Sequence, residues 1–256
     1  MITHFAEIHL QTLSPIGVRQ VYHDALAFPI LSESEDDIRI AITPHTALHF
    51  TRSSVPIKPA HLAFEVRHST YADTADLLEY THVALCGDVE TETTHQRYFK
   101  DGDGNILEAY SHDYVNESVI VPENALGVMY LREAGLVVDD LAGCWDWLAE
   151  TFGTTNTRGD RNGKFSIVAA GTAHFVLNHV TRRWVPIDAT ALKPQMRITL
   201  GTPSLNDIAE IRKHPDCIQS TDGSLFLQRE EYLFQIQHTP DFNSAIPQRL
   251  KLPHVD

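Results

Sequence analysis

The sequence lacks the features that mark several common classes of protein. Its three cysteines, Cys86, Cys144 and Cys217, are widely spaced and form no CxxC pair, so neither a disulfide framework nor a thiolate zinc site is expected. No run of about 18 apolar residues occurs, and no basic segment followed by an apolar one opens the chain. We therefore expect no membrane span and no signal peptide, and we predict a cytoplasmic protein.

Positive charge is also scarce. The chain has 20 Lys and Arg residues against 34 Asp and Glu residues, which gives a net charge of −14. Binding to nucleic acid or to anionic lipid requires basic surface, so neither partner is expected. Hydrophobic residues make up 43% of the 256 positions, enough for one large or two ordinary folded domains.

What the sequence does contain is an internal repeat. Alternating residues predict a strand over 4–12, and Ser14-Pro15 then predicts the start of a helix. Further strands are predicted in the 30–52 region, which completes one βαβββ unit. The same order of elements returns three more times, so the repeat predicts four βαβββ units. These later units are expected to begin near residues 61, 131 and 196.

Three strings carry chemistry-bearing residues at corresponding places in this repeat: FAEIHL at 5–10, HLAFEV at 61–66 and DGDGNILE at 101–108. They resemble the first strand, the third-quarter strand and the closing hairpin of the vicinal oxygen chelate superfamily. This superfamily includes glyoxalase I, extradiol dioxygenases and bleomycin-resistance proteins. Gly102 stands where that family usually has proline. The resemblance implies an α+β fold of four βαβββ units, paired into two glyoxalase-like domains with cupped mixed sheets.

The resemblance also implies a metal site. It places ligands at Glu7, His49, His61 and Glu108, with His9 as the alternative to His49, and it implies one divalent ion per chain. Imidazole and carboxylate ligands suit Zn, Ni, Fe, Mn or Co, of which Zn is our first choice. Glu7, Glu108 and His9 are the predicted catalytic residues. The metal-binding domain is predicted to span residues 1–113.

The second half of the chain, residues 127–240, is predicted to be a degenerate copy of the first. There Glu133 corresponds to Glu7, His174 to His49, Arg197 to His61 and Gln235 to Glu108. Arginine is always protonated and cannot be a ligand, so this half is expected to hold no metal. We predict that Arg197 pairs with Glu133.

Three functions fit these residues. The first is glyoxalase-like lyase or isomerase chemistry on a small substrate that chelates the metal through vicinal oxygens. The second is extradiol ring cleavage, for which two His and one carboxylate are typical. The third is non-catalytic binding of a small molecule, as in resistance proteins. A monomer or a homodimer is expected.

Overall fold

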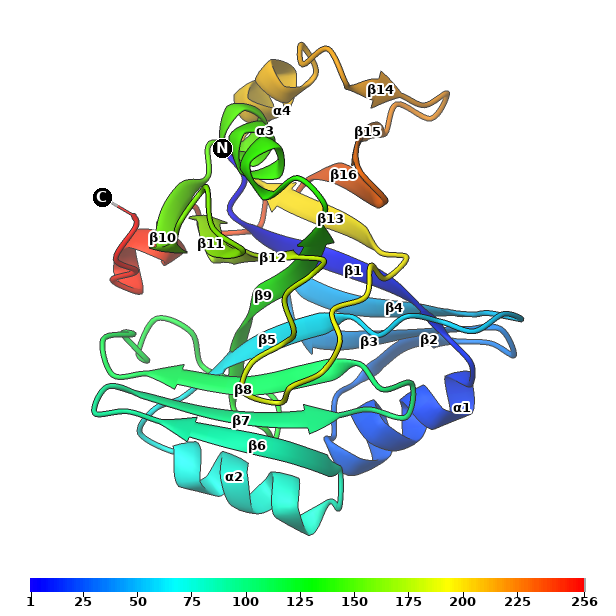
Figure 1. Cartoon of the computed structure of the whole chain (residues 1–256), viewed down its shortest axis with the longest axis vertical. Coiled ribbons are helices and arrows are strands. Elements are labelled where there is room, and N and C mark those ends of the chain that lie inside the picture. Colours follow the sequence, from blue (N-terminus) through cyan, green and yellow to red (C-terminus); the bar gives the residue numbers. More distant parts are fainter. Residues whose placement is uncertain (256) are drawn as a thin grey trace.

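The structure is a computed structural model that describes residues 1–255, and it contains four successive βαβββ units (Figure 1). Unit 1 comprises β1 (His4–Thr12), α1 (Pro15–Val18) with its π-helical continuation η1 (Arg19–Ala25), β2 (Ile30–Glu33), β3 (Asp37–Thr43) and β4 (Thr46–Arg52). Unit 2 comprises β5 (His61–Val66), α2 (Tyr71–Tyr80), β6 (Ala84–Glu90), β7 (Thr94–Lys100) and β8 (Ile106–His112).

Unit 3 comprises β9 (Val128–Val138), α3 (Leu141–Phe152), β10 (Thr155–Gly159), β11 (Phe165–Ala170) and β12 (Ala173–His179). Unit 4 comprises β13 (Arg197–Thr202), α4 (Leu205–Ile211), β14 (Ile218–Gln219), β15 (Leu225–Arg229) and β16 (Tyr232–His238). A short helix, α5 (Ile246–Arg249), follows. The predicted repeat is confirmed.

The units pair in an order that the sequence did not predict. Units 1 and 4 form one eight-stranded sheet, ordered β14-β15-β16-β13-β1-β4-β3-β2, which we call sheet I. Units 2 and 3 form the other, ordered β10-β11-β12-β9-β5-β8-β7-β6, which we call sheet II. The first strands of the paired units are antiparallel neighbours, with Ile8 opposite Ile198 and Leu62 opposite Ala134.

The predicted α+β fold with two cupped mixed sheets is thus confirmed, whereas the predicted domain boundaries are wrong. Residues 1–113 and 127–240 do not form separate domains, because each half contributes strands to both sheets. Alternating residues along the first strand of a unit show which of its faces is buried. They do not show which other unit supplies the neighbouring strand. The repeat therefore defined the units and left their partners unspecified.

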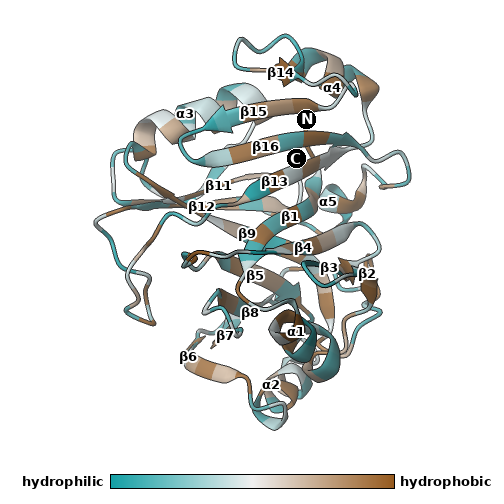
Figure 2. Cartoon of the chain, turned by 90° about the vertical axis from the view of Figure 1, so that its right-hand side faces the viewer, coloured by the Kyte–Doolittle hydropathy of each residue, from teal (hydrophilic) through white to brown (hydrophobic). Residues whose placement is uncertain are grey.

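The largest hydrophobic cluster lies between the two sheets and includes residues from all four units. Phe5 of sheet I contacts Phe175 of sheet II edge to face, with ring centroids 5.4 Å apart. The core leaves one face of each sheet free, and Figure 2 shows hydrophilic as well as hydrophobic positions along their strands. The free face of each sheet is where polar side chains gather.

Local sequence signals set where the helices begin. The Ser14 hydroxyl accepts a hydrogen bond from the Gly17 amide at 3.0 Å, with Pro15 in the first turn of α1. The Asp140 carboxylate caps α3 in the same way, through the Gly143 amide at 2.9 Å. No helix in residues 1–255 is long and apolar enough to cross a membrane.

Candidate metal centre

Three buried side chains converge on the free face of sheet II: His61 from β5, Glu108 from β8 and Glu133 from β9. One potential ligand atom from each lies within 4.8 Å of the other two. His61 Nε2 is 3.7 Å from Glu108 Oε2 and 3.7 Å from Glu133 Oε2. Adjacent central strands bring these residues together, although 72 positions separate His61 from Glu133 in the sequence.

The surroundings of His61 orient its ring for a ligand role. Its Nδ1 lies 3.3 Å from the Ile106 carbonyl oxygen, so Nδ1 carries the proton that is donated there. Nε2 then faces the two carboxylates, the orientation found in metal sites whose histidine is fixed by a second hydrogen bond. The indole of Trp184 packs against the other side of the ring, with centroids 4.8 Å apart.

The residue opposite His61 across the β5–β9 pair must be small. A Cβ added at Gly135 would lie 2.9 Å from the His61 Cβ and 2.8 Å from the Trp184 indole. Both distances are shorter than ordinary carbon–carbon contacts. Glycine at this position therefore allows the histidine and the tryptophan to pack over β9.

The two carboxylates are buried together, with only 2% of Glu108 and 4% of Glu133 exposed. Burial, followed by the charge of Glu133, raises the pKa of Glu108 well above its usual range. Burial also acts to raise the pKa of Glu133, but His61 and the charge of Arg132 outweigh it and lower that pKa. Glu108 Oε1 is buried and has no hydrogen-bond partner.

These observations show that the residues fit a divalent cation. Two buried acids and an imidazole lone pair are the donor set that Zn, Fe, Mn, Co or Ni accepts. A buried carboxylate oxygen without a partner is costly in the absence of a counter-charge, and a cation at this place would supply it. Three protein ligands would leave coordination positions open for a substrate.

A buried ion pair supports the floor of the site beside these ligands. Arg132 Nη1 donates to Glu65 Oε2 at 2.9 Å, and His112 Nδ1 lies 3.1 Å from both oxygens of the same carboxylate. Tyr114 Oη accepts a further bond from Arg132 Nη2 at 3.1 Å. Arg132 thus pairs with Glu65, and its Nε also lies 3.7 Å from Glu133 Oε1. Among the described residues, no Arg or Lys lies within 4.0 Å of Glu108.

The centre opens into a cavity of about 640 Å³ in the cup of sheet II. Tyr98 and Tyr110 form part of its wall, and the segment 184–187 between β12 and β13 covers it. A neighbouring cavity of about 530 Å³ shares Glu133, Tyr110 and Arg158 with the first. The cup is therefore an elongated space with the candidate ligands near its middle.

Two of the four predicted ligands, His61 and Glu108, belong to this centre, whereas Glu7 and His49 lie on sheet I. The predicted four-ligand set is therefore wrong. Glu7 Oε2 accepts a bond from Arg39 Nε at 2.7 Å, and Glu7 Oε1 lies 3.5 Å from Arg197 Nη2. Arg197 consequently pairs with Glu7 rather than with Glu133, because units 1 and 4 share a sheet.

The other predicted residues of sheet I form their own network. His49 Nε2 forms a short hydrogen bond with Asp37, and its ring stacks on His9 with centroids 4.3 Å apart. His9 Nε2 lies 2.8 Å from Thr51 Oγ1. Burial, and then the nearby His49, lowers the pKa of His9 to about 4. The predicted catalytic residues Glu7 and His9 are thus on the opposite sheet from the candidate metal centre.

Strand register also corrects one correspondence within the repeat. His49 on β4 lies opposite His9, which is two positions after Glu7 on β1. Glu108 on β8 likewise lies opposite Ala63, two positions after His61 on β5. In unit 3 the equivalent pair is Gly135 on β9 and Val176 on β12, whereas His174 lies opposite Glu133 itself. The fourth ligand position of sheet II is therefore Val176, which cannot bind a metal.

Glu133 is the member of the candidate centre that the sequence analysis did not place in it. It was recognised as the equivalent of Glu7, but it was assigned to a half expected to lack metal. The sequence did contain a signal: on the first strand of its own unit, Glu133 and His61 each stand at the position equivalent to Glu7. Pairing units 2 and 3 would have joined them.

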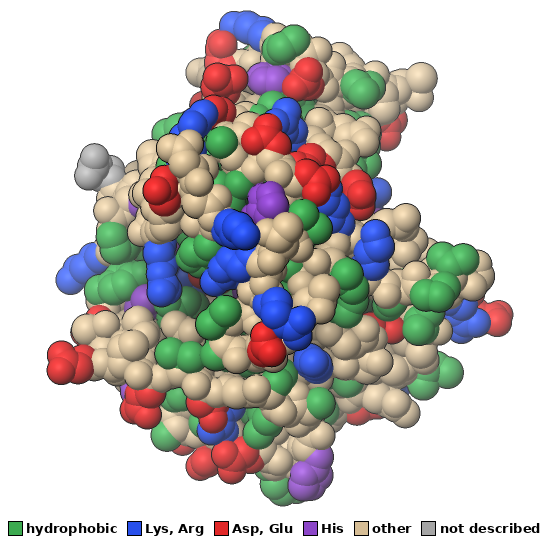
Figure 3. Space-filling model, in the orientation of Figure 1, with side chains coloured by type: hydrophobic (Ala, Val, Ile, Leu, Met, Phe, Trp, Pro, Cys, Tyr) green, Lys and Arg blue, Asp and Glu red, His purple; other side chains and the backbone are tan. Residues whose placement is uncertain are grey.

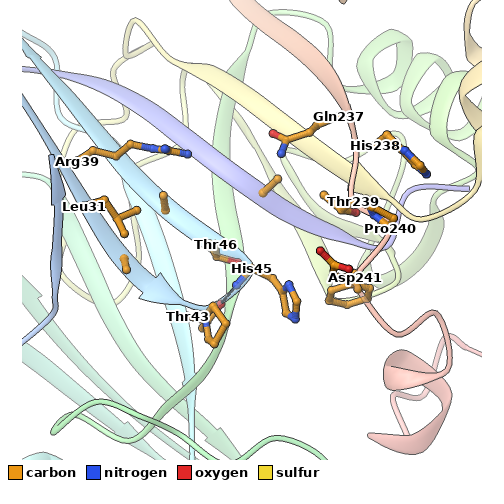
Figure 4. Close-up of a pocket in the computed structure, with 15 residues that line it drawn as sticks. Leu31, Arg39, Thr43, His45, Thr46, Gln237, His238, Thr239, Pro240 and Asp241 are labelled. Atoms are coloured by element: carbon orange, nitrogen blue, oxygen red, sulfur yellow. Dashed lines mark hydrogen bonds between the residues drawn. The ribbon is translucent and has the colours of Figure 1, made fainter.

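Sheet I has a hollow of its own, of about 340 Å³, between the β3–β4 turn and the stretch after β16. Figure 4 shows His45 and Asp241 on its two sides, with Arg39 toward one end. Arg39 is already paired with Glu7. Among the described residues, the convergent His and carboxylate set occurs in the cup of sheet II and not in this hollow.

No family model matches the sequence, and no curated protein matches it significantly. Solved structures do match the fold. A proposed dioxygenase from Bacillus subtilis subsp. subtilis str. 168 is 14% identical with a TM-score of 0.71, over 95% of this chain and 87% of that one. Glyoxalase I from Zea mays is 12% identical with a TM-score of 0.59, over 91% of both chains. The chain thus has the glyoxalase-like fold that was predicted.

Proposed function

We propose that the protein is a metalloenzyme in which His61, Glu108 and Glu133 hold one divalent ion that binds a small substrate through vicinal oxygens. The observation that carries the proposal is that one potential ligand atom from each of these residues lies within 4.8 Å of the other two. One of the buried carboxylates, that of Glu108, also has an oxygen without a hydrogen-bond partner. The cavity of about 640 Å³ is within the usual range for a small-molecule site. Both cups are complete within one chain, so a monomer is sufficient.

A bound divalent ion would polarise the substrate's oxygens and stabilise the negative charge that develops on them. The chain's own groups would do the rest. Glu108 Oε1 is the free oxygen that can accept a proton from a carbon next to those oxygens. Tyr98 and Tyr110 line the cavity. The Tyr110 hydroxyl can donate a hydrogen bond to the substrate, whereas Tyr98 Oη already donates to Gln96 Oε1 at 2.9 Å. The buried Trp184 indole packs against His61 and covers that side of the site.

This arrangement favours glyoxalase-like lyase or isomerase chemistry, because such a reaction needs a base and a polarising ion. Extradiol ring cleavage is the second candidate. In its support, the set has three protein ligands rather than four, which leaves room for a catechol and for O₂. One His with two carboxylates, in place of two His with one, is the argument against it.

Metal analysis of four purified variants tests the ligand set. We expect one ion per chain in the wild type and its loss in His61→Ala, Glu108→Gln and Glu133→Gln. The matched control is Glu7→Gln, which changes the equivalent position of sheet I and should retain the ion. Retention of metal in two of the three ligand variants, or its loss in Glu7→Gln, would show that the ion binds elsewhere.

Two activity assays then separate the reactions. Conversion of a hemithioacetal without oxygen consumption would support the lyase or isomerase assignment. Oxygen uptake with catechols after loading with ferrous iron would support ring cleavage instead. A metal-loaded protein that binds these compounds and converts none of them would match the non-catalytic binding protein.

A further inference from the structure

Two arginines lie side by side on the wall of the sheet II cavity. Arg158 is in β10, and Arg182 is in the connection between β12 and β13. Both approach the ring of Phe165, which also lines the cavity. The guanidinium carbon of Arg182 is 4.4 Å from the ring centroid and that of Arg158 is 6.0 Å away. Such stacking fixes the guanidinium planes while leaving their N–H groups free to donate.

Neither arginine has an acidic partner within 4.0 Å in the described part of the chain. This is notable in a protein with 34 acidic residues, where the adjacent Arg183 pairs with Asp188. Arg182 instead donates to the neutral Asn178 amide oxygen at 2.6 Å. Burial, and then the charge of Arg158, lowers the pKa of Arg182, so the two cations disfavour each other.

The pair is therefore a concentration of uncompensated positive charge beside the candidate metal centre. Figure 3 shows Lys and Arg side chains gathered near the middle of this face, where the connection between β12 and β13 crosses in Figure 1. The whole chain carries a net charge of −14, so a local excess of positive charge at this opening would favour a negatively charged ligand there. A neutral ligand would leave both guanidinium charges without a counter-charge.

We propose that Arg158 and Arg182 bind an anionic group, carboxylate or phosphate, at the end of the substrate away from its chelating oxygens. The proposal deepens the proposed function, because it defines the substrate class for the same cavity: a small chelating molecule that carries a distal negative charge. The planar guanidinium groups match both carboxylate and phosphate through paired N–H donors.

Binding of two catechols to the manganese-loaded protein tests the proposal by calorimetry. The first is 3-(3,4-dihydroxyphenyl)propanoate, and the second is the uncharged 4-propylcatechol. We expect the anionic compound to bind at least about tenfold more tightly, and each of Arg158→Gln and Arg182→Gln to remove about tenfold of its affinity. Binding of 4-propylcatechol should be unchanged in both variants. The advantage should also shrink as salt rises, because Arg158 is exposed.

The matched control is Arg161→Gln, which removes an arginine from the same β10–β11 hairpin. Arg161 is paired with Asp146 on α3 and does not line the cavity, so affinity for both catechols should be unchanged. Equal affinity of the wild type for the two catechols, or equal losses in all three arginine variants, would overturn the proposal.

A second arm separates this proposal from failure of the metal centre. The probes 3-phenylpropanoate and phenyl phosphate carry the anion without vicinal oxygens, and they are titrated into the metal-free protein. If manganese does not increase the affinity of the protein for either catechol, the proposed function fails. Loss of 3-phenylpropanoate or phenyl phosphate binding in Arg158→Gln and Arg182→Gln would still support the anion site, and the tighter-binding probe identifies the anion. Unchanged binding of both probes in both variants refutes it.

Discussion

Replacing Glu108 by glutamine should have opposite effects on the protein with and without metal. In the metal-free protein the Glu108 carboxylate is buried beside Glu133, and one of its oxygens has no partner. Its raised pKa means that the folded state binds a proton more tightly than the unfolded chain does. Stability is therefore lost as the pH rises from the unfolded pKa of about 4.3 toward the folded value. Glu108→Gln removes this loss.

The magnitude follows from the same linkage. Each unit between the folded and unfolded pKa values is worth about 1.4 kcal/mol, so Glu108→Gln at pH 7.5 in a chelator should be at least as stable as the wild type. Metal at a hundred times its dissociation constant should stabilise the wild type by about 2.7 kcal/mol. For a chain of this size that corresponds to a rise in Tm of roughly 5–11 °C. The variant should lose most of this rise, because a neutral amide oxygen is a poor ligand.

Thermal unfolding of the two proteins, each in chelator and in excess metal, is the assay. Glu7→Gln is the control, and it should show the reverse pattern. It leaves Arg39 and Arg197 without their carboxylate, which should cost about 1–3 kcal/mol in chelator, and it should keep the full metal-induced rise in Tm. If Glu108→Gln is instead less stable in chelator and keeps that rise, the assignment of Glu108 is refuted.

Three further predictions concern the framework of the two cups. Glu65→Ala leaves the buried Arg132 charge uncompensated and should lower the free energy of unfolding in urea by about 3–5 kcal/mol; a change below about 1 kcal/mol would contradict the ion pair. Gly135→Ala places a Cβ 2.9 Å from that of His61, so metal affinity in a competition titration should fall about 10- to 100-fold. Burial, and then His45, lowers the pKa of His4 to about 3, so unfolding takes up a proton below pH 6.5. His4 should therefore account for about 2 kcal/mol of the stability that the wild type loses between pH 7 and pH 5, and His4→Phe should lose about 2 kcal/mol less over that range.

The sequence predicted the units of this fold better than their arrangement. Alternation along 4–12 and the helix-start signals at Ser14 and Asp140 are local, so they could be read without tertiary information. Within 89–99 a tight turn separates β6 from β7, closed by a hydrogen bond from the Thr91 amide to the Thr94 carbonyl oxygen at 2.9 Å. Short polar turns inside an otherwise strand-like stretch are difficult to recognise from composition alone.

The candidate site illustrates the same division. His61 and Glu108 come from one unit, so their proximity was predictable from the repeat. Glu133 comes from another unit, and its place depended on a pairing between first strands that has no local signal. The error propagated: once units 1 and 2 were assumed to pair, Glu7 and His49 became ligands, and Arg197 became the partner of Glu133.

The observed pairing explains why one repeat position serves two purposes in this chain. That position holds Glu7 and Arg197 in sheet I, where the opposite charges meet and neutralise each other. In sheet II it holds His61 and Glu133, and Glu108 adds a second carboxylate. The cup of sheet I therefore contains its own cation, whereas the cup of sheet II holds two buried carboxylates around one histidine, an arrangement that a bound cation would stabilise. Charge balance, more than the number of possible ligands, distinguishes the cup proposed to bind metal from the cup that is closed by an arginine.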